Sequence, residues 1–159
     1  MGSDADWFRP RYELAKIDSL FLVMWMMPAS RGLPRVLSIP AWRDGHYVSL
    51  AELLRVLGRL VSGLSWRVSI VEVAPDATAE ELEAVSPSDT LDTSQLLHLS
   101  TPDVQIIDGM VSGFDAARLH APVLVLRAVD STSWDIEYEN DEVTAVLRAS
   151  YPEAKSLSL

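Results

Sequence analysis

Hydrophobic residues recur at helical spacing between Leu50 and Ser62. The apolar stripe of this segment, typical of a helix that faces a core, consists of Leu50, Leu53, Leu54, Leu57, Leu60, Val61 and Leu64. Ser49 and Glu52 have the spacing of a capping box, in which each side chain accepts a hydrogen bond from a free backbone amide. Gly63 follows where a left-handed C-cap residue is expected. The pattern predicts a core-facing helix over residues 50–62.

Alternating or wholly apolar segments predict the strands. The segment that begins at Trp66 alternates cleanly and places Trp66, Val68 and Ile70 on one side. A polar pair, Asp108 and Gly109, separates two apolar pieces, which form either a tight hairpin or one strand with a bulge at that pair. The predicted strands comprise residues 20–27, 35–39, 66–73, 104–107, 110–114, 122–129 and 133–139.

Three shorter helical signals follow the main helix. Thr78 and Glu81 repeat the capping-box spacing ahead of a helix that ends near residue 85. The polar segment 86–94 predicts a mobile loop or a seam between subdomains, and a single helical turn follows at about residues 95–99. Asn140 caps a last helix that ends near residue 150.

These elements predict an α+β fold with a mainly antiparallel or mixed sheet of five to seven strands and three or four helices. A small doubly wound α/β domain is the alternative, and it requires a helix between most successive strands. We expect one globular domain over residues 1–159, with frayed ends at about residues 1–10 and 152–159.

The composition agrees with a single globular domain and excludes several kinds of catalytic and metal site. Hydrophobic residues make up 48% of the 159 positions, which is enough apolar surface to offset the ordering entropy of folding. Absence of cysteine excludes disulfides, thiolate metal sites and a cysteine nucleophile. The three histidines lie far apart, so we expect neither a metal nor a cofactor. No P-loop, G-x-G-x-x-G or G-x-S-x-G motif occurs, and no catalytic residue is assigned.

Charge and hydropathy also restrict location and partners. The first six residues are acidic rather than basic, unlike a secretory signal, and the most apolar run, residues 20–27, is far shorter than the roughly 20 residues that cross a bilayer. We therefore expect a cytoplasmic protein without membrane contact. A net charge of −10 argues against nucleic acid as a partner. Five tryptophans and five methionines leave self-association as a homo-oligomer open.

Negative charge is concentrated in the second half of the chain. Residues 1–67 have a net charge of +3 and residues 68–159 a net charge of −13. If residues 133–139 form a strand, their two-residue period places a row of carboxylates on one face and aromatic and apolar side chains on the other. Such a row is tolerated at a solvated, aggregation-blocking edge or opposite a cationic partner.

Two functional hypotheses follow. In the leading hypothesis the chain is a non-enzymatic acidic domain that binds a basic protein, and the partner-binding residues are Asp135, Glu137, Glu139, Asp141 and Glu142. In the alternative, a polar and aromatic loop ahead of the main helix binds a small ligand or carries out catalysis, because an anion can dock against an arginine and the helix amides. The residues of this loop are Arg43, Asp44, His46 and Tyr47.

A resemblance supports the first hypothesis. The stretch from Leu126 to Val143, LRAVDSTSWDIEYENDEV, closes with an amphipathic helix. It is similar to the C-terminal strand–helix ending of small bacterial proteins, some of which resemble immunity proteins of contact-dependent or polymorphic toxin systems. With the helix that follows to about residue 150, the resemblance covers about a sixth of the chain, and it implies a small, acidic, cytoplasmic, partner-binding protein, with no role for any single residue.

Overall fold

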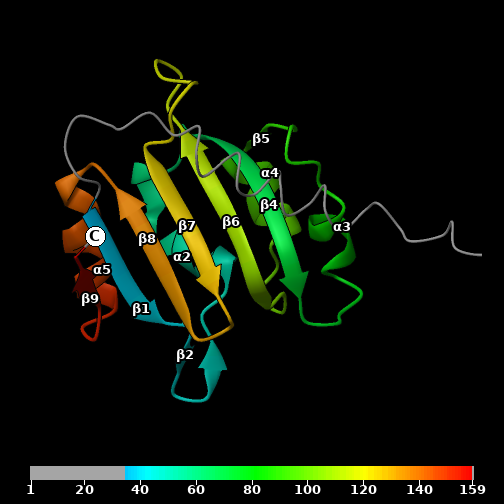
Figure 1. Cartoon of the computed structure of the whole chain (residues 1–159), viewed down its shortest axis with the longest axis horizontal. Coiled ribbons are helices and arrows are strands. Elements are labelled where there is room, and N and C mark those ends of the chain that lie inside the picture. Colours follow the sequence, from blue (N-terminus) through cyan, green and yellow to red (C-terminus); the bar gives the residue numbers. More distant parts are fainter. Residues whose placement is uncertain (1–34, 159) are drawn as a thin grey trace, which may run out of the picture. The chain divides into compact units, whose positions relative to one another are not determined.

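A computed structural model describes residues 35–158, whose centre is a seven-stranded sheet (Figure 1). All neighbouring strands are antiparallel, in the order β5-β4-β6-β7-β8-β1-β9. The strands are β1 (Arg35–Pro40), β4 (Ser65–Val73), β5 (Leu91–Asp92), β6 (Ile106–Phe114), β7 (Leu124–Val129), β8 (Ser133–Tyr138) and β9 (Lys155–Leu157). The predicted α+β class is confirmed, and the doubly wound alternative is excluded because it requires parallel strands.

A separate two-stranded hairpin and four α-helices complete the described part of the chain. The hairpin consists of β2 (Trp42–Arg43) and β3 (His46–Tyr47), and the helices are α2 (Leu50–Leu57), α3 (Glu80–Glu83), α4 (Thr93–Leu99) and α5 (Asp141–Ser150). In the view of Figure 1, α2 and α4 lie behind the sheet. No helix among residues 35–158 combines the length and apolar character needed to cross a bilayer. The predicted strand at 20–27 and the predicted frayed end at 1–10 lie outside the described residues.

The core lies between the sheet and these helices. Strand register aligns one row of buried side chains across five strands, formed by Leu37, Ile136, Leu126, Val111 and Val68. The apolar stripe of α2 is buried against the same cluster. The predicted inner face of β4 is confirmed in its main part, because Trp66 and Val68 are fully buried.

Two buried tryptophans fix elements that are distant in sequence. The Trp66 indole N–H donates to Thr93 Oγ1 at 2.8 Å, and that hydroxyl donates to the Val61 carbonyl at 2.6 Å. The Trp134 indole N–H donates to the Val48 carbonyl at 2.8 Å. Each indole therefore has the hydrogen-bond partner that burial of its N–H requires.

The main helix begins as predicted and ends earlier. Ser49 is the N-cap of this helix, and the Ser49 hydroxyl accepts a 3.2 Å hydrogen bond from the Glu52 backbone N–H. Regular α-helix ends at Gly58, whose φ of +51° is a left-handed conformation that glycine adopts without a Cβ clash. A 3-10 turn, η1 (Gly58–Leu60), then continues the apolar stripe. The prediction that Gly63 is the C-cap is therefore wrong.

Other local predictions are corrected by the structure. Thr78 does not cap α3. Its backbone N–H and its hydroxyl group both donate hydrogen bonds to Asp76 Oδ1 instead. The predicted loop 86–94 contains β5 and the start of α4, where Asp92 and Gln95 form a capping box. Residues 106–114 form one strand whose pairing with β4 is irregular near Asp108, which confirms the bulged-strand alternative. Residues 155–157 are not frayed, because they pair with β1 as β9.

Candidate functional site

The predicted row of carboxylates lies on a central strand. β8 pairs with β7 on one side and with β1 on the other, so it is not an edge strand. Trp134, Ile136 and Tyr138 are buried as the two-residue period predicts. Asp135 and Glu137, on the opposite face, are only partly exposed. The interpretation of this row as a solvated protective edge is therefore wrong.

Each of the five predicted partner-binding residues interacts with another side chain of the same molecule. Asp135 accepts a 2.6 Å hydrogen bond from Ser38, and Glu137 pairs with Arg127 at 2.9 Å. The remaining three pairs are Glu139 with Arg118, Asp141 with Arg35 and Glu142 with Arg59. The first of these is bidentate, with N–O distances of 2.9 and 3.0 Å, and this hydrogen bonding lowers the pKa of Glu139. Four of the five carboxylates are therefore paired with an arginine, and Asp135 is hydrogen-bonded to a neutral hydroxyl.

The predicted ligand loop is the β2–β3 hairpin, and its arginine is also engaged. Asp44 and Gly45 both have positive φ and form the tight turn. The Arg43 guanidinium donates to the Ser150 carbonyl at 3.0 Å, pairs with Glu153 and lies 5.0 Å from the centre of the Tyr151 ring. Arg43 thus holds the hairpin against the end of α5.

The other two loop residues lie beside the first turn of α2. His46 Nε2 is 3.4 Å from one carboxylate oxygen of Glu52, and Tyr151 donates a 2.9 Å hydrogen bond to the other. The Tyr47 hydroxyl donates to the Ile106 carbonyl at 2.8 Å, and burial raises the pKa of this phenol. Glu52 was predicted only as a capping residue, and no site role was predicted for Tyr151. Their role beside His46 depends on a contact between α2 and α5 that no local pattern contains.

A surface groove opens beside this network. Its volume is about 570 Å³, and it is lined by His46, Tyr47, Ser49, Glu52, Arg55, Val56 and Pro102. Arg43 and Asp44 are not among the lining residues. Among residues 35–158, no three His, Asp or Glu side chains are grouped as a metal site requires. The groove therefore combines ionic groups of α2 with apolar walls.

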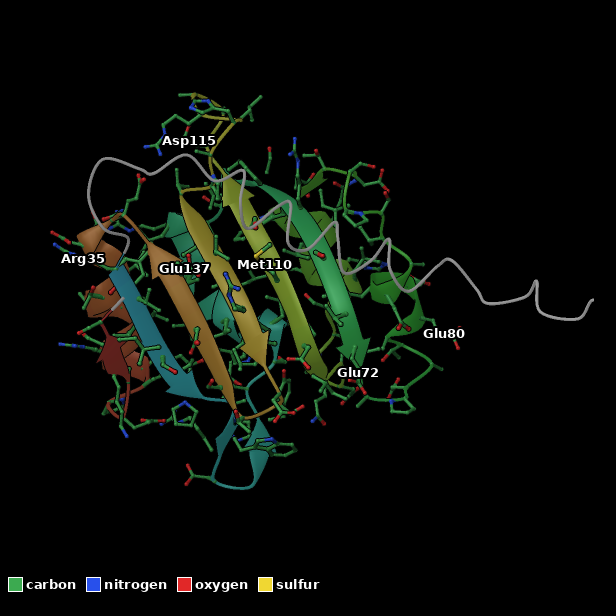
Figure 2. All side chains as sticks on the ribbon, viewed as in Figure 1. Arg35, Glu72, Glu80, Met110, Asp115 and Glu137 are labelled. Carbon is green, nitrogen blue, oxygen red and sulfur yellow. The ribbon has the colours of Figure 1, made fainter. Side chains whose placement is uncertain are left out.

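The largest excess of negative charge lies elsewhere, between β4 and β6. Residues 68–117 contain ten Asp and Glu and no Lys or Arg. Nine of these ten residues are exposed, and none of the ten forms an ion pair among residues 35–158. Six of the exposed residues lie on β4 or between β4 and β5; we call these six the acidic edge, and they are Glu72, Asp76, Glu80, Glu81, Glu83 and Asp89. Figure 2 shows Glu72 and Glu80 on the β4 and α3 side of the sheet, well away from Glu137. The net charge of −13 over residues 68–159 does not reveal this segment, because it also includes the arginines that follow residue 117.

The acidic edge borders an incompletely paired strand. Within the described part of the chain, β5 pairs with β4 only at Ser65 and Trp66, so residues 67–73 of β4 have no strand on that side. Val71 is an extra residue in the pairing of β4 with β6 and is 48% exposed. A bulge and neighbouring charges discourage pairing between two such edges.

Comparison of the chain with models of known protein families, with curated proteins and with solved structures finds no match.

Proposed function

We propose that this chain is a non-enzymatic interaction domain that binds a basic protein through the acidic edge. The observation that carries the proposal is the contrast between two groups of carboxylates. Those at positions 135–142 are engaged by Arg35, Arg59, Arg118, Arg127 and Ser38, whereas those of the acidic edge form no ion pair with any described residue. The proposed surface is therefore different from the row at 135–142 that the sequence pattern favours.

Unpaired carboxylates suit recognition for a physical reason. Charges that are already neutralised contribute little to the field outside the protein, whereas unpaired charges of one sign add to a potential that steers an oppositely charged partner. The first turn of α3 alone contributes Glu80, Glu81 and Glu83, all exposed. A Lys- and Arg-rich protein surface is the matching partner.

A second copy of this chain fits the same surface poorly. Two copies that met at the acidic edge would bring six carboxylates against six, and close like-charge contacts oppose association. The bulge at Val71 adds to this, because it interrupts the regular edge that another β4 would need. The proposal therefore favours a different, basic protein over a homo-oligomer. The resemblance of residues 126–143 supports a more specific version of this proposal. In that version the chain has an immunity-type role, in which a small acidic protein binds a toxin.

The test is capture of the partner by two variants of equal charge. The first variant, Glu80→Gln, Glu81→Gln and Glu83→Gln, removes three charges from the acidic edge. The control variant, Asp44→Asn, Asp130→Asn and Glu142→Gln, removes three exposed charges elsewhere and keeps residues that tolerate the positive φ of the two turn positions.

We expect the unaltered protein and the control to retain a basic protein at low salt and release it at high salt, and the first variant to lose it. Equal retention by both variants, or no basic protein retained by the unaltered chain, contradicts the proposal.

A further inference from the structure

The groove beside α2 contains an anion and a cation that do not pair with each other. Glu52 and Arg55 are three residues apart on α2, a spacing at which opposite charges commonly interact. One carboxylate oxygen of Glu52 instead accepts a hydrogen bond from the Tyr151 hydroxyl, and the other lies 3.4 Å from His46 Nε2. Among residues 35–158, no carboxylate oxygen lies within 4.0 Å of the Arg55 side-chain nitrogens. A fixed anion and an available cation therefore line the same groove.

The remaining walls and the size of the groove define what fits between these charges. Val56 and Pro102 supply apolar surface, and about 570 Å³ is within the range of small-molecule sites, roughly 300–1,000 Å³. Side chains three residues apart on a helix have Cβ atoms about 5–6 Å from each other. A ligand with opposite charges a few bonds apart and an apolar group can therefore contact all three features.

We propose that this groove binds a free α-amino acid with an apolar side chain. Its carboxylate accepts hydrogen bonds from the Arg55 guanidinium, whose planar donors match a carboxylate. Its ammonium group donates to Glu52, which Tyr151 holds in place, and its side chain covers Val56 and Pro102. This inference is independent of the proposed function, because it uses neither the acidic edge nor a protein partner.

The alternative loop site predicted from the sequence differs from this one in its cation. Arg43 is occupied by Glu153 and the Ser150 carbonyl, so it is not available to a ligand. Arg55 lies on the groove and is exposed. Of the predicted loop residues, His46 and Tyr47 line the groove.

Calorimetric titration of the full chain with three matched probes tests the inference. The probes are leucine, leucinamide, which lacks the carboxylate, and 4-methylpentanoate, which lacks the ammonium group. We expect leucine to bind and each analogue to bind at least about tenfold more weakly, because each leaves one charged group of the groove unpaired. Arg55→Gln should abolish leucine binding, whereas Arg59→Gln, a change of equal charge outside the lining residues, should leave it unchanged.

Three results would overturn the inference. The first is absence of leucine binding up to about 10 mM. The second is equal binding of 4-methylpentanoate and leucine, which shows a simple anion site. The third is unchanged leucine binding in Arg55→Gln. Because Arg55 is exposed and has no ion pair in the described residues, this variant should fold normally, and circular dichroism checks that it does.

Discussion

Tyr151, which follows the last residue of α5, donates a 2.9 Å hydrogen bond to Glu52 in the first turn of α2. The Tyr151 side chain is fully buried, and Arg43 of the β2–β3 hairpin lies over its ring. One phenol thus joins the hairpin, the start of α2 and the end of α5. Glu52 has the spacing of a capping residue, but it serves this long-range contact.

Tyr151→Phe should lower the free energy of unfolding by about 1–2 kcal/mol, because it removes a hydrogen bond to a charged group and keeps the ring. Urea unfolding measures the change. In a double-mutant cycle with Glu52→Gln, the two effects should be clearly non-additive. Additive effects would show that the two side chains do not stabilise the fold through each other.

Stability should fall in alkaline solution because of Tyr47 and Tyr151. Burial, and for Tyr151 also the Glu52 carboxylate, raises the pKa of both phenols above the usual 10.0. Above pH 10 the unfolded chain loses these protons while the folded protein keeps them, so the free energy of unfolding decreases by at most about 1.4 kcal/mol per pH unit for each tyrosine.

Tyr47→Phe tests this directly. The variant should be less stable at neutral pH, because it loses the hydrogen bond to the Ile106 carbonyl, but its stability should fall less steeply above pH 10. Denaturant unfolding at several pH values measures both effects. The same slope in the variant and the unaltered protein would contradict the assignment.

Ser131→Gly should stabilise the protein by about 0.5 kcal/mol. Asp130 and Ser131 are the central residues of the turn from Val129 to Thr132 that joins β7 to β8, and their φ values of 47° and 53° are in the positive range in which Asn and Gly are favoured. Glycine at the second position removes the left-handed conformation's cost of about 1–2 kcal/mol, which exceeds the loss of the 3.1 Å hydrogen bond that Gln105 donates to the Ser131 hydroxyl. In contrast, Ser133→Gly in the adjacent strand β8 should destabilise. Thermal unfolding should therefore shift in opposite directions, and a shift in the same direction would contradict the turn assignment.

Glu137→Gln should destabilise the protein by about 1 kcal/mol. Repulsion within the carboxylate row predicts the opposite, because Asp135 and Glu139 lie two positions away on either side. The structure pairs Glu137 with Arg127 at 2.9 Å, and both side chains are less than one-third exposed, so removal of the anion leaves a partly buried cation without its partner. Urea unfolding at neutral pH measures the change. A variant at least as stable as the unaltered protein would show that repulsion dominates.

Local sequence patterns predicted the elements whose signals lie within one segment. The N-cap at Ser49, the inner face of β4 and the last helix after Asn140 are examples, because caps and periodicity act over a few residues. The end of α2 was missed for a related reason. The 3-10 turn that begins at Gly58 keeps Leu60 packed against the core, so the apolar stripe does not show where α-helical geometry ends.

The sites depend on contacts between distant segments, and these could not be predicted from periodicity. Arg127 pairs with Glu137 because β7 lies beside β8 in the sheet, and Arg118, from the segment between β6 and β7, pairs with Glu139 just after β8. β1, from a distant part of the chain, pairs with β8 and so places it away from the edge, and the C-terminal tail adds β9 as a further strand beyond β1. The absence of Lys and Arg from residues 68–117, by contrast, is visible in the sequence and is best seen in windows shorter than half the chain.

The most direct measurement of the central claim is the association rate of the captured basic protein with the two charge-matched variants, at increasing ionic strength. Loss of the carboxylates at Glu80, Glu81 and Glu83 should slow association by about tenfold at low salt and flatten its salt dependence. The control variant at Asp44, Asp130 and Glu142 should behave as the unaltered protein does. Equal slowing of both variants, which shows dependence on net charge alone, would contradict recognition through the acidic edge.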